Sequence, residues 1–249
     1  MANHQFATTL LKAFDILDCF TTGEEELGIS EIAAQVGLPP SSVHRLIQSL
    51  EFEGLLFQNQ ENKKYYLGTK FFTYAGKGGR FQHYQKLAAK YVDELAGITK
   101  ETTNLAICSG DHIFNIYKKD SPFILRPNFA LNAPYPAHCT GVGRVFLSQM
   151  TDASIKWVYE NNAGQIQQSL PDFLDMLHQV RKNGWALDDK AFSPDLRCVA
   201  APVRAAGETV VFALSVSAPA TRMTDPVFEQ NRELVVKYAS LITEELQSY

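Results

Sequence analysis

The stretch GLPPSSVHRLIQSLEFEGLL, from Gly37 to Leu56, decides how the first quarter of this chain folds. Its prolines suit the first turn of a helix, where backbone N–H groups have no intrahelical acceptor. Apolar residues then recur at the spacing of one helical face and predict a buried stripe: Val43, Leu46, Ile47 and Leu50. The opposite face carries Ser41, Arg45, Gln48 and Phe52, with Ser42 and His44 on its flanks.

A second short helix is predicted immediately before this one. Ser30 precedes EIAAQVG, where we expect it to cap the helix N-terminus, and Gly37 suits the C-terminal end. A further helix is expected at about Thr9–Phe20. Two short helices joined by a tight turn at Gly37 and Leu38, the second with a polar outer face, predict a helix-turn-helix.

A candidate wing follows that helix. After Gly54, LLFQ and KYYLG predict two strands around the turn Asn59–Asn62. Lys63 and Lys64 stand where such a hairpin would meet a phosphate backbone. The hairpin favours a winged helix-turn-helix over residues 6–68 and disfavours the other interpretation, an ordinary solvated helix surface. Arg45 and Gln48 suit paired hydrogen bonds to base edges, and the serines and His44 suit phosphates.

The rest of the chain predicts an α+β fold with an antiparallel sheet flanked by helices. Residues 69–97 are expected to form a linker with an amphipathic helix at Phe81–Leu95 that ends at Gly97. The second domain is expected over residues 98–249. Its predicted strands are TNLAIC, IFNIYKK, RCVAAPVR and VVFALSVSAP, the last two joined by a turn at Ala206, Gly207 and Glu208, and its predicted helices are Thr140–Met150, Thr151–Asn161, Pro171–Asn183 and Asp225–Gln247.

Composition and charge limit the possible functions. Of the 249 residues, 45% are hydrophobic and 20% are charged, which suits a sizeable buried core. The net charge is -4, and residues 1–80 hold 7 Lys+Arg against 9 Asp+Glu. DNA-binding proteins usually show a basic surface. Any DNA binding must therefore depend on the local arrangement of side chains.

The four cysteines are widely scattered and match neither a disulfide framework nor a CxxC metal site. Their pattern is typical of a reducing cytoplasm. The N-terminus lacks the features of a secretory signal, and no apolar run approaches the roughly 20 residues of a membrane span. We therefore expect a cytoplasmic protein without a membrane partner.

The segment HCTGVGR, from His138 to Arg144, has a catalytic and a binding interpretation. Cys139 beside His138 would be a nucleophile with its base, but adjacent residues rarely face each other and no orienting group is evident. Small residues before a helix expose N–H groups that favour a carboxylate. We therefore expect no catalytic residue. Because the sequence has no dinucleotide motif and no metal-ligand spacing, we also expect no cofactor and no metal. Cys198 suits a core strand.

Four blocks of the chain, in the same order, resemble the IclR-type transcriptional regulators. LGISEIAAQVGLPPSSVHRLIQSLEFEGLL…YYLG is similar to the helix-turn-helix and wing of that family, and ETTNLAICSGDHIFNIYKK to the first hairpin of its effector domain. PYPAHCTGVGRVFLSQM and GWALDDKAFSPDLRCVAAPVR…VVFALSVSAPATRM resemble two C-terminal blocks. The resemblance implies a winged-helix domain, a dimerisation helix and an effector domain akin to GAF and PAS folds.

The resemblance also implies a site and a partner. Such regulators bind palindromic operators as dimers or dimers of dimers and commonly sense small organic acids from catabolic pathways. The matching blocks imply effector contacts at Tyr135, Gly141, Val142, Asp188, Cys198, Ser215 and Ser217. The predicted DNA contacts are Ser30, Ser41, Ser42, His44, Arg45, Gln48, Lys63 and Lys64.

Three departures from the family pattern bear on the ligand. Arg144 and Val145 replace the usual Lys-Ala after Gly143, and Lys190 with Ala191 replaces two acidic residues. Lys190 indicates either a more anionic ligand than usual or a different loop. Tyr135 stands where an aliphatic residue is frequent, which favours a planar or aromatic acid.

The sequence thus predicts a ligand-responsive transcriptional repressor, not an enzyme, that binds double-stranded operator DNA as a homodimer or a dimer of dimers. Two alternatives remain open at this point. One is a thiol-dependent hydrolase with a sensory-type domain and Cys139 or Cys198 as nucleophile. The other is a protein-interaction module whose polar helical face contacts a partner protein.

Overall fold

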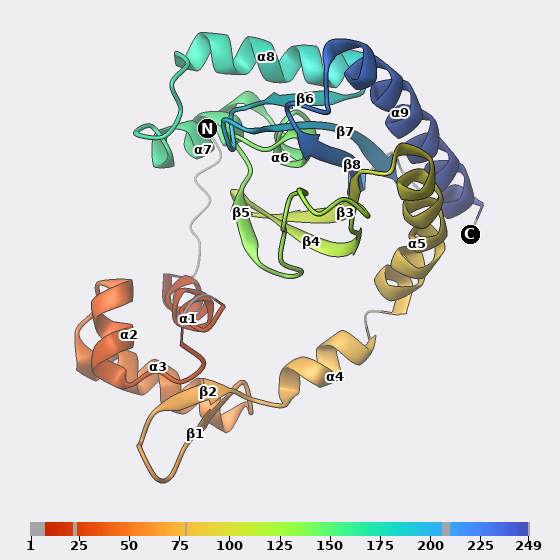
Figure 1. Ribbon diagram of the computed structural model, residues 1–249. Helices are drawn as coiled ribbons and strands as arrows, with labels where there is room; N and C mark the ends of the chain where they lie inside the picture. The colour runs from red at the N-terminus through yellow and green to blue at the C-terminus, as the bar shows by residue number, and fades with distance from the viewer. Residues whose placement is uncertain (1–7, 22–23, 78, 206–209, 249) are drawn as a thin grey trace. The chain divides into compact units, whose positions relative to one another are not determined.

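The computed structural model describes residues 8–21, 24–77, 79–205 and 210–248. The chain divides into two compact units, residues 1–80 and residues 81–249, and each is described by itself (Figure 1). Within the described ranges, no helix is long and apolar enough to cross a membrane.

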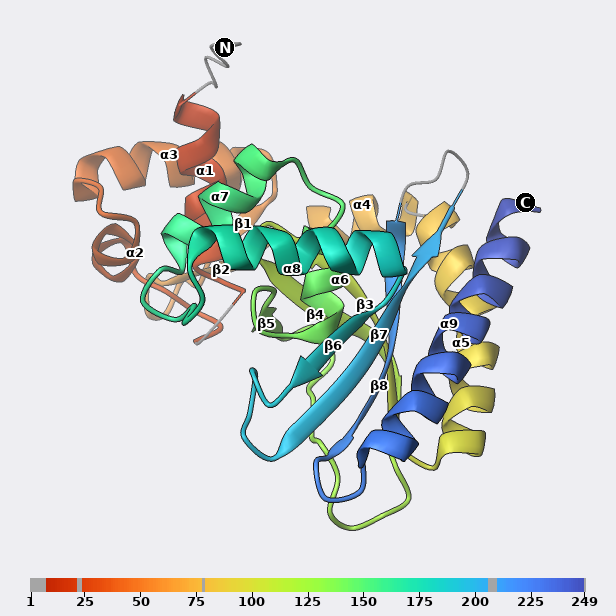
Figure 2. The ribbon, with the colours of Figure 1, turned by 90° about the horizontal axis from the view of Figure 1, so that it is seen from above.

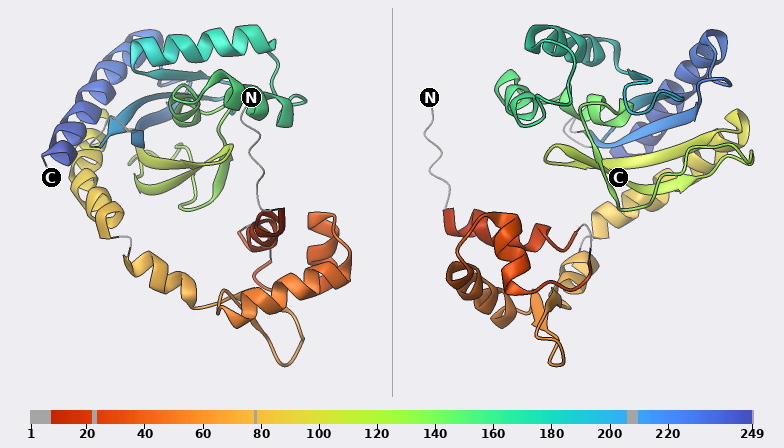
Figure 3. Two further views of the ribbon diagram at one scale, coloured as in Figure 1. Left: turned by 180° about the vertical axis from the view of Figure 1, so that it is seen from behind. Right: turned by 60° about the vertical axis from the view of Figure 1, so that its left-hand side comes forward.

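The first unit packs three helices and a hairpin around one core. Its elements are α1 (Thr8–Asp18), α2 (Ile29–Val36), α3 (Pro40–Phe52), β1 (Leu56–Gln58), β2 (Tyr65–Leu67) and α4 (Lys70–Lys77). The antiparallel β1–β2 hairpin projects from the helices as a wing (Figure 3). Apolar faces converge on a fully or nearly fully buried set: Ile16, Ile32, Val43, Ile47, Leu56 and Tyr65. The predicted winged helix-turn-helix is confirmed.

The turn between α2 and α3 forms as the sequence predicts, but the cap of α2 does not. Gly37 takes the left-handed conformation, with φ of 65°, and its N–H bonds to the carbonyl of Ala33. The predicted cap at Ser30 is wrong, because α2 begins at Ile29 and Gly28 occupies the cap position. The Glu31 carboxylate accepts the Gly28 N–H at 2.6 Å, so a side chain from the first turn performs the capping.

The second unit is built on a six-stranded antiparallel sheet in the order β5-β4-β3-β8-β7-β6, as far as the described residues extend. Its strands are β3 (Thr102–Ser109), β4 (His112–Lys119), β5 (Pro134–Pro136), β6 (Ala186–Asp189), β7 (Leu196–Arg204) and β8 (Val210–Pro219). Its helices are α5 (Gly79–Thr99), which begins at the unit boundary, α6 (Gly141–Leu147), α7 (Asp152–Asn161), α8 (Leu170–Asn183) and α9 (Asp225–Gln247). The predicted α+β class is confirmed.

Helices cover both faces of this sheet (Figure 2). On one face, α5 and α9 pack against large residues of the central strands, such as Leu105, Leu214 and Val216. On the other face, the strands present alanines instead: Ala106, Ala200 and Ala213. Because these side chains are small, α6 can approach the sheet closely and close one wall of a cavity.

Several predicted boundaries need correction. The first helix ends at Asp18, and the helix beginning near residue 141 ends at Leu147. Gly97 does not end α5, because Lys100 takes the left-handed position, with φ of 59°, and its N–H bonds to the carbonyl of Ala96. Short elements escaped the sequence patterns altogether: α4, β5 and β6. The predicted turn at residues 206–208 lies outside the described residues.

Candidate functional site

The outer face of α3 is polar and exposed, as its pattern predicts. Val43, Ile47 and Leu50 are buried, whereas the predicted contact residues of this helix are all exposed: Ser41, Ser42, His44, Arg45 and Gln48. Ser30 is exposed on α2. Phe52, at the end of the same face, is 89% exposed. The helix therefore presents hydrogen-bonding side chains to a partner without disturbing the core.

The two wing lysines have different surroundings. Lys63 is exposed at the hairpin loop, with φ of 62°, and its Nζ donates to the Gln60 side chain at 3.2 Å. Lys64 turns toward α2, where its Nζ lies 3.0 Å from Glu31 and 3.5 Å from Glu24. The Glu31 hydrogen bond raises the pKa of Lys64. Lys64 therefore links the wing to the helix-turn-helix through ion pairs in this conformation, whereas Lys63 has no carboxylate partner among the described residues.

A carboxylate also holds the wing loop. Glu26 accepts hydrogen bonds from the side chains of Asn59 at 3.0 Å and Asn62 at 2.6 Å. These bonds lower the pKa of Glu26. The wing is thus held in place by Glu26 as well as by Lys64.

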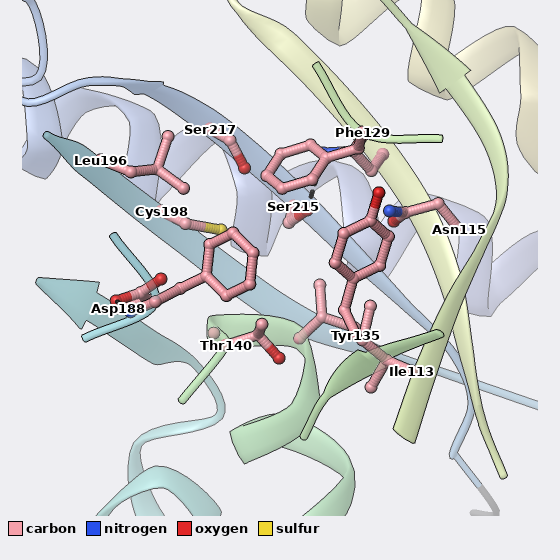
Figure 4. Close-up of a pocket in the computed structure, with 14 residues that line it drawn as sticks. Ile113, Asn115, Phe129, Tyr135, Thr140, Asp188, Leu196, Cys198, Ser215 and Ser217 are labelled. Carbon is pink, nitrogen blue, oxygen red and sulfur yellow. Dashed lines mark hydrogen bonds between the residues drawn. The ribbon is translucent and has the colours of Figure 1, made fainter. Parts of the chain in front are cut away.

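In the second unit, one cavity collects all seven residues that the resemblance assigns to an effector (Figure 4). Its complete lining is Asn104, Ile113, Asn115, Phe129, Tyr135, Thr140, Gly141, Val142, Asp188, Phe192, Leu196, Cys198, Ser215 and Ser217. The assigned role of the seven in effector binding stays a prediction.

The sheet register explains why polar side chains meet here. Cys198 pairs with Asp188 on one side and Ser217 on the other, so the three form a row across β6, β7 and β8. Ser215 pairs with Asn104 of β3 and begins the next row. Residues two apart on a strand share a face, so Ser215 and Ser217 both point toward α6. Both serines are 1% exposed.

The start of α6 closes the cavity from the other side. Thr140 caps the helix by accepting the Gly143 N–H at 3.1 Å. A Cβ atom at Gly141 would lie 3.4 Å from the Cys198 sulfur and 3.6 Å from the Ala200 Cβ. A methyl group at Gly141 would therefore make ordinary contacts with the sheet and take up part of the cavity.

Among the described residues that line the cavity, Asp188 is the only carboxylate, and it is 1% exposed. Burial raises its pKa, and this effect is opposed by hydrogen bonds from the N–H groups of Ala191 and Phe192 and by the charge of Arg144. The two N–H groups donate to Asp188 Oδ1 at 2.8 and 3.3 Å. Asp188 therefore also fixes the loop that carries the Phe192 ring over the cavity.

Three aromatic rings separate this inner cavity from a larger outer one. Phe129, Tyr135 and Phe192 have ring centroids 5.5 to 6.1 Å apart. The inner cavity has about 30 Å³ of free volume, which holds about two water molecules. The same rings line an outer cavity of about 470 Å³. Movement of the rings would join the two volumes.

Several lining residues have no counterpart in the sequence predictions. Asn104 and Asn115 are polar residues inside apolar strands, a signal that could have found them. Phe129 and Phe192 lie in loops, where periodicity gives no information. Lys190 is exposed, has φ of 65° and is not among the described residues that line the cavity. Its departure from the family pattern therefore fits a different loop better than a more anionic ligand.

The environments of the cysteines do not suit catalysis. Burial raises the pKa of Cys139 and of Cys108 to about 11, and that of Cys198 to about 12. A nucleophilic cysteine needs a lowered pKa to form thiolate near neutrality. Among the described residues, no group of three or more His, Cys, Asp or Glu side chains is placed to hold a metal ion.

Comparison with known proteins agrees with this architecture. The model of the "Bacterial transcriptional regulator IclR C-terminal" family matches residues 82–244, and that of the "IclR helix-turn-helix domain" matches residues 9–60. The regulator KdgR of Escherichia coli is 30% identical over 224 residues, covering 88% of this chain and 84% of its own. The regulator XynR of the same species is 30% identical over 231 residues, covering 89% and 90%.

Solved structures show the same fold. A putative IclR transcriptional regulator from Silicibacter sp. TM1040 superposes with a TM-score of 0.84 at 22% identity, covering 96% of each chain. An IclR homolog from Microbacterium hydrocarbonoxydans, complexed with 4-hydroxybenzoate, superposes with a TM-score of 0.71 at 17% identity, covering 97% of this chain and 100% of its own. These relatives are regulators and not hydrolases, and the chain belongs to the IclR family of bacterial transcriptional regulators.

Proposed function

We propose that this protein is a cytoplasmic repressor that binds operator DNA as a dimer or a dimer of dimers and responds to a small carboxylic acid. The observation that carries the proposal is the single cavity lined by all seven expected effector residues, in a chain that also carries a winged helix-turn-helix. Its repressor action is supported by a 26% identical relative, the acetate operon repressor of Salmonella typhimurium, matched over 243 residues.

On DNA, each protomer would insert α3 into a major groove. Arg45 and Gln48 are exposed and have the donors for base edges. Ser30, Ser41, Ser42 and His44, together with Lys63 of the wing, would contact phosphates, and Lys64 would join them once it is released from Glu31. A two-fold dimer would place two α3 helices about 34 Å apart, one turn of the duplex. α5 is the helix that we propose for dimerisation, within a linker over residues 69–97 between domains at 6–68 and 98–249.

The first prediction concerns the wing. Glu31→Gln keeps an oxygen that accepts the Gly28 N–H but removes the closer of the two charges that hold Lys64, the other being Glu24. The released lysine should gain a phosphate contact, so the plot of log affinity against log salt should steepen by about 0.9 per protomer. Filter binding or fluorescence anisotropy across a salt series measures this slope.

A matched control removes the same charge elsewhere on the wing. Glu61 is exposed and its side chain forms no ion pair with any described residue. Glu61→Gln should leave the salt slope nearly unchanged. Equal steepening by both variants would mean that net charge alone acts, and that Lys64 does not reach the phosphate when released.

The effector would be a small acid, and an aromatic one is favoured. Ser215, Ser217 and Asn104 supply hydroxyl and amide groups, and Tyr135 adds an aromatic face. A structural neighbour is complexed with 4-hydroxybenzoate, which supports a phenolic or benzoic acid for this cavity also. Backbone N–H groups at Gly141 and Val142 would receive the carboxylate, and Asp188 would accept a hydroxyl hydrogen.

Entry of such an acid requires more room than the inner cavity offers. A benzoic acid exceeds about 30 Å³, so Phe129, Tyr135 and Phe192 would have to move outward as it enters. Phe129 and Phe192 lie on the loops before β5 and after β6, and Tyr135 lies on β5 itself. Their movement would favour one of two dimer geometries and alter the spacing of the α3 helices.

The second prediction tests the cavity. Ser215→Ala combined with Ser217→Ala should remove the stabilisation that a bound acid confers in a thermal-shift screen of benzoate, 4-hydroxybenzoate and aliphatic acids. A ligand at 100 times its dissociation constant stabilises the folded state by about 2.7 kcal/mol, which the wild-type protein should show. Ser240→Ala, at an exposed position of α9, serves as the control. Undiminished stabilisation of the double variant would place the acid elsewhere.

A further inference from the structure

A second cavity, apart from the inner and outer cavities described above, lies between α8 and the edge strand β6, and none of the described residues that line it lines the inner cavity. Its volume is about 490 Å³. In Figure 1, α8 runs alongside β6. The lining combines one arginine, one aspartate and three amide side chains with an apolar set that includes Met176, Val180 and Trp185.

Arg144 is a buried cation that lines this cavity, and it forms no ion pair with any described residue. It is 9% exposed, and its Nε and Nη1 donate to the carbonyls of His138, at 3.4 Å, and Leu187, at 2.5 Å. Its Nη2 makes no hydrogen bond to any described residue. Burial lowers the pKa of Arg144, but a guanidinium stays charged in proteins. Nη2 is therefore a charged donor without an acceptor in the described structure, and an anion in the cavity would give it a charge-assisted hydrogen bond.

The edge of the sheet supplies a second donor to the same place. β6 pairs only with β7 in the described sheet, so its outer edge is free. The Leu187 carbonyl points outward to Arg144, and in an antiparallel strand the N–H of a residue points to the same side as its carbonyl. The Leu187 N–H therefore points outward near the guanidinium. A guanidinium beside a backbone N–H suits the two oxygens of a carboxylate.

Neither carboxylate near this cavity forms an ion pair with Arg144 in the described structure. Asp189 is held by Arg197, with its Oδ1 3.0 Å from Nε, and Arg197 also pairs with Asp225 at 2.9 Å. Asp188 faces α6, where its charge raises the pKa of Arg144 against the effect of burial, but its Oδ1 accepts the N–H groups of Ala191 and Phe192 and it forms no hydrogen bond to the guanidinium in the described structure. Nη2 of Arg144 thus remains a donor that neither carboxylate occupies.

The apolar part of the lining indicates the rest of the ligand. Trp185 is half-buried, with its ring 6.0 Å from the Phe228 ring and 5.5 Å from the Arg232 guanidinium. Met176 and Val180 of α8 form the opposite apolar lining. We propose that this cavity is a second ligand site, separate from the effector cavity, that binds a small carboxylate with an apolar body through Arg144 and the Leu187 N–H.

Trp185 makes the site observable. Trp157 and Trp185 are the two tryptophans of the chain, so Trp157→Phe leaves Trp185 as the sole indole. Titration of this variant with hexanoate should change Trp185 fluorescence saturably, and hexanamide, which lacks the charge, should not. Calorimetry of the same titration should show binding with matching affinity. Absence of both signals would overturn the proposal.

Variants then assign the signal. In the Trp157→Phe background, Arg144→Gln and Gln179→Glu should each weaken hexanoate binding about tenfold or more, by loss of a charged donor or by like-charge repulsion. Gln179 is exposed on α8, so its variant tests the site even where Arg144→Gln fails to fold. Gln230→Glu, at an exposed position of α9, should leave the affinity unchanged.

The two cavities are distinguished by the serine variant. Ser215→Ala with Ser217→Ala should retain the Trp185 response, because neither serine lines the second cavity. Loss of the response in that variant, together with its retention in Gln179→Glu, would show that hexanoate acts from the effector cavity and would overturn the second site. Hexanoate binding at the second cavity requires neither DNA binding nor a particular acid in the effector cavity.

Discussion

Gly143→Ala is expected to destabilise the second unit by about 3 kcal/mol or more, which is a large share of the 5–15 kcal/mol typical of a folded domain. A Cβ atom at Gly143 would lie 2.1 Å from the carbonyl oxygen of Ala137 and 2.3 Å from its Cα. These atoms belong to the backbone, and Ala137 is fully buried. No rotamer change relieves such a contact, so α6 would have to move away from the sheet.

Gly141→Ala is the matched control, two residues away on the same helix. Its Cβ would make ordinary contacts of 3.4 to 3.6 Å with Cys198, Ala200 and Asp188. We expect it to fold normally but to bind the acid more weakly, because the added methyl group occupies the cavity. Urea unfolding followed by circular dichroism measures the two stabilities. Equal stability of the two variants would contradict the close packing of α6 against Ala137.

Periodicity predicted the parts of this fold in which one face is buried. The stripe of α3 is decided by 3.6-residue spacing, and Ile47 is fully buried as expected. The serines of β8 are different, because strand alternation cannot tell a cavity-facing serine from a satisfied core serine. Their proximity to Asp188 follows from the pairing of β6, β7 and β8, which depends on contacts distant in sequence. Only the resemblance to a family indicated those positions.

Features that depend on local conformation or on loops escaped prediction. Lys64 was expected at a phosphate, yet its ion pair with Glu31 depends on how the wing folds back on α2. Phe129 and Phe192 meet over the cavity through loops whose paths no residue pattern fixes. In the sequence, Arg144 only replaces the lysine that the family usually has with another basic residue. Its placement behind β6, in a different cavity from Asp188, follows from the rotation of α6 against the sheet.

Arg45→Ala is expected to weaken binding to the operator by about 1–3 kcal/mol, roughly tenfold to more than a hundredfold, if the side chain makes a bidentate contact to a base. Arg45 is exposed on α3, one helical turn before Gln48. The operator can be selected from a random oligonucleotide pool, with and without added acids. Competition anisotropy then measures binding to the selected site and to an unrelated duplex.

The two duplexes separate base recognition from simple charge. A base contact should be lost only on the operator, so the ratio of specific to non-specific affinity should fall. Lys156→Ala removes one positive charge from an exposed position of α7 in the second unit and should leave that ratio unchanged. An equal loss on both duplexes would make Arg45 a phosphate contact and move base recognition to Gln48. Because Arg45 lies outside the unit that holds the cavity, acid binding to the free protein should be unaffected, and a parallel loss there would show that the substitution damages the protein generally.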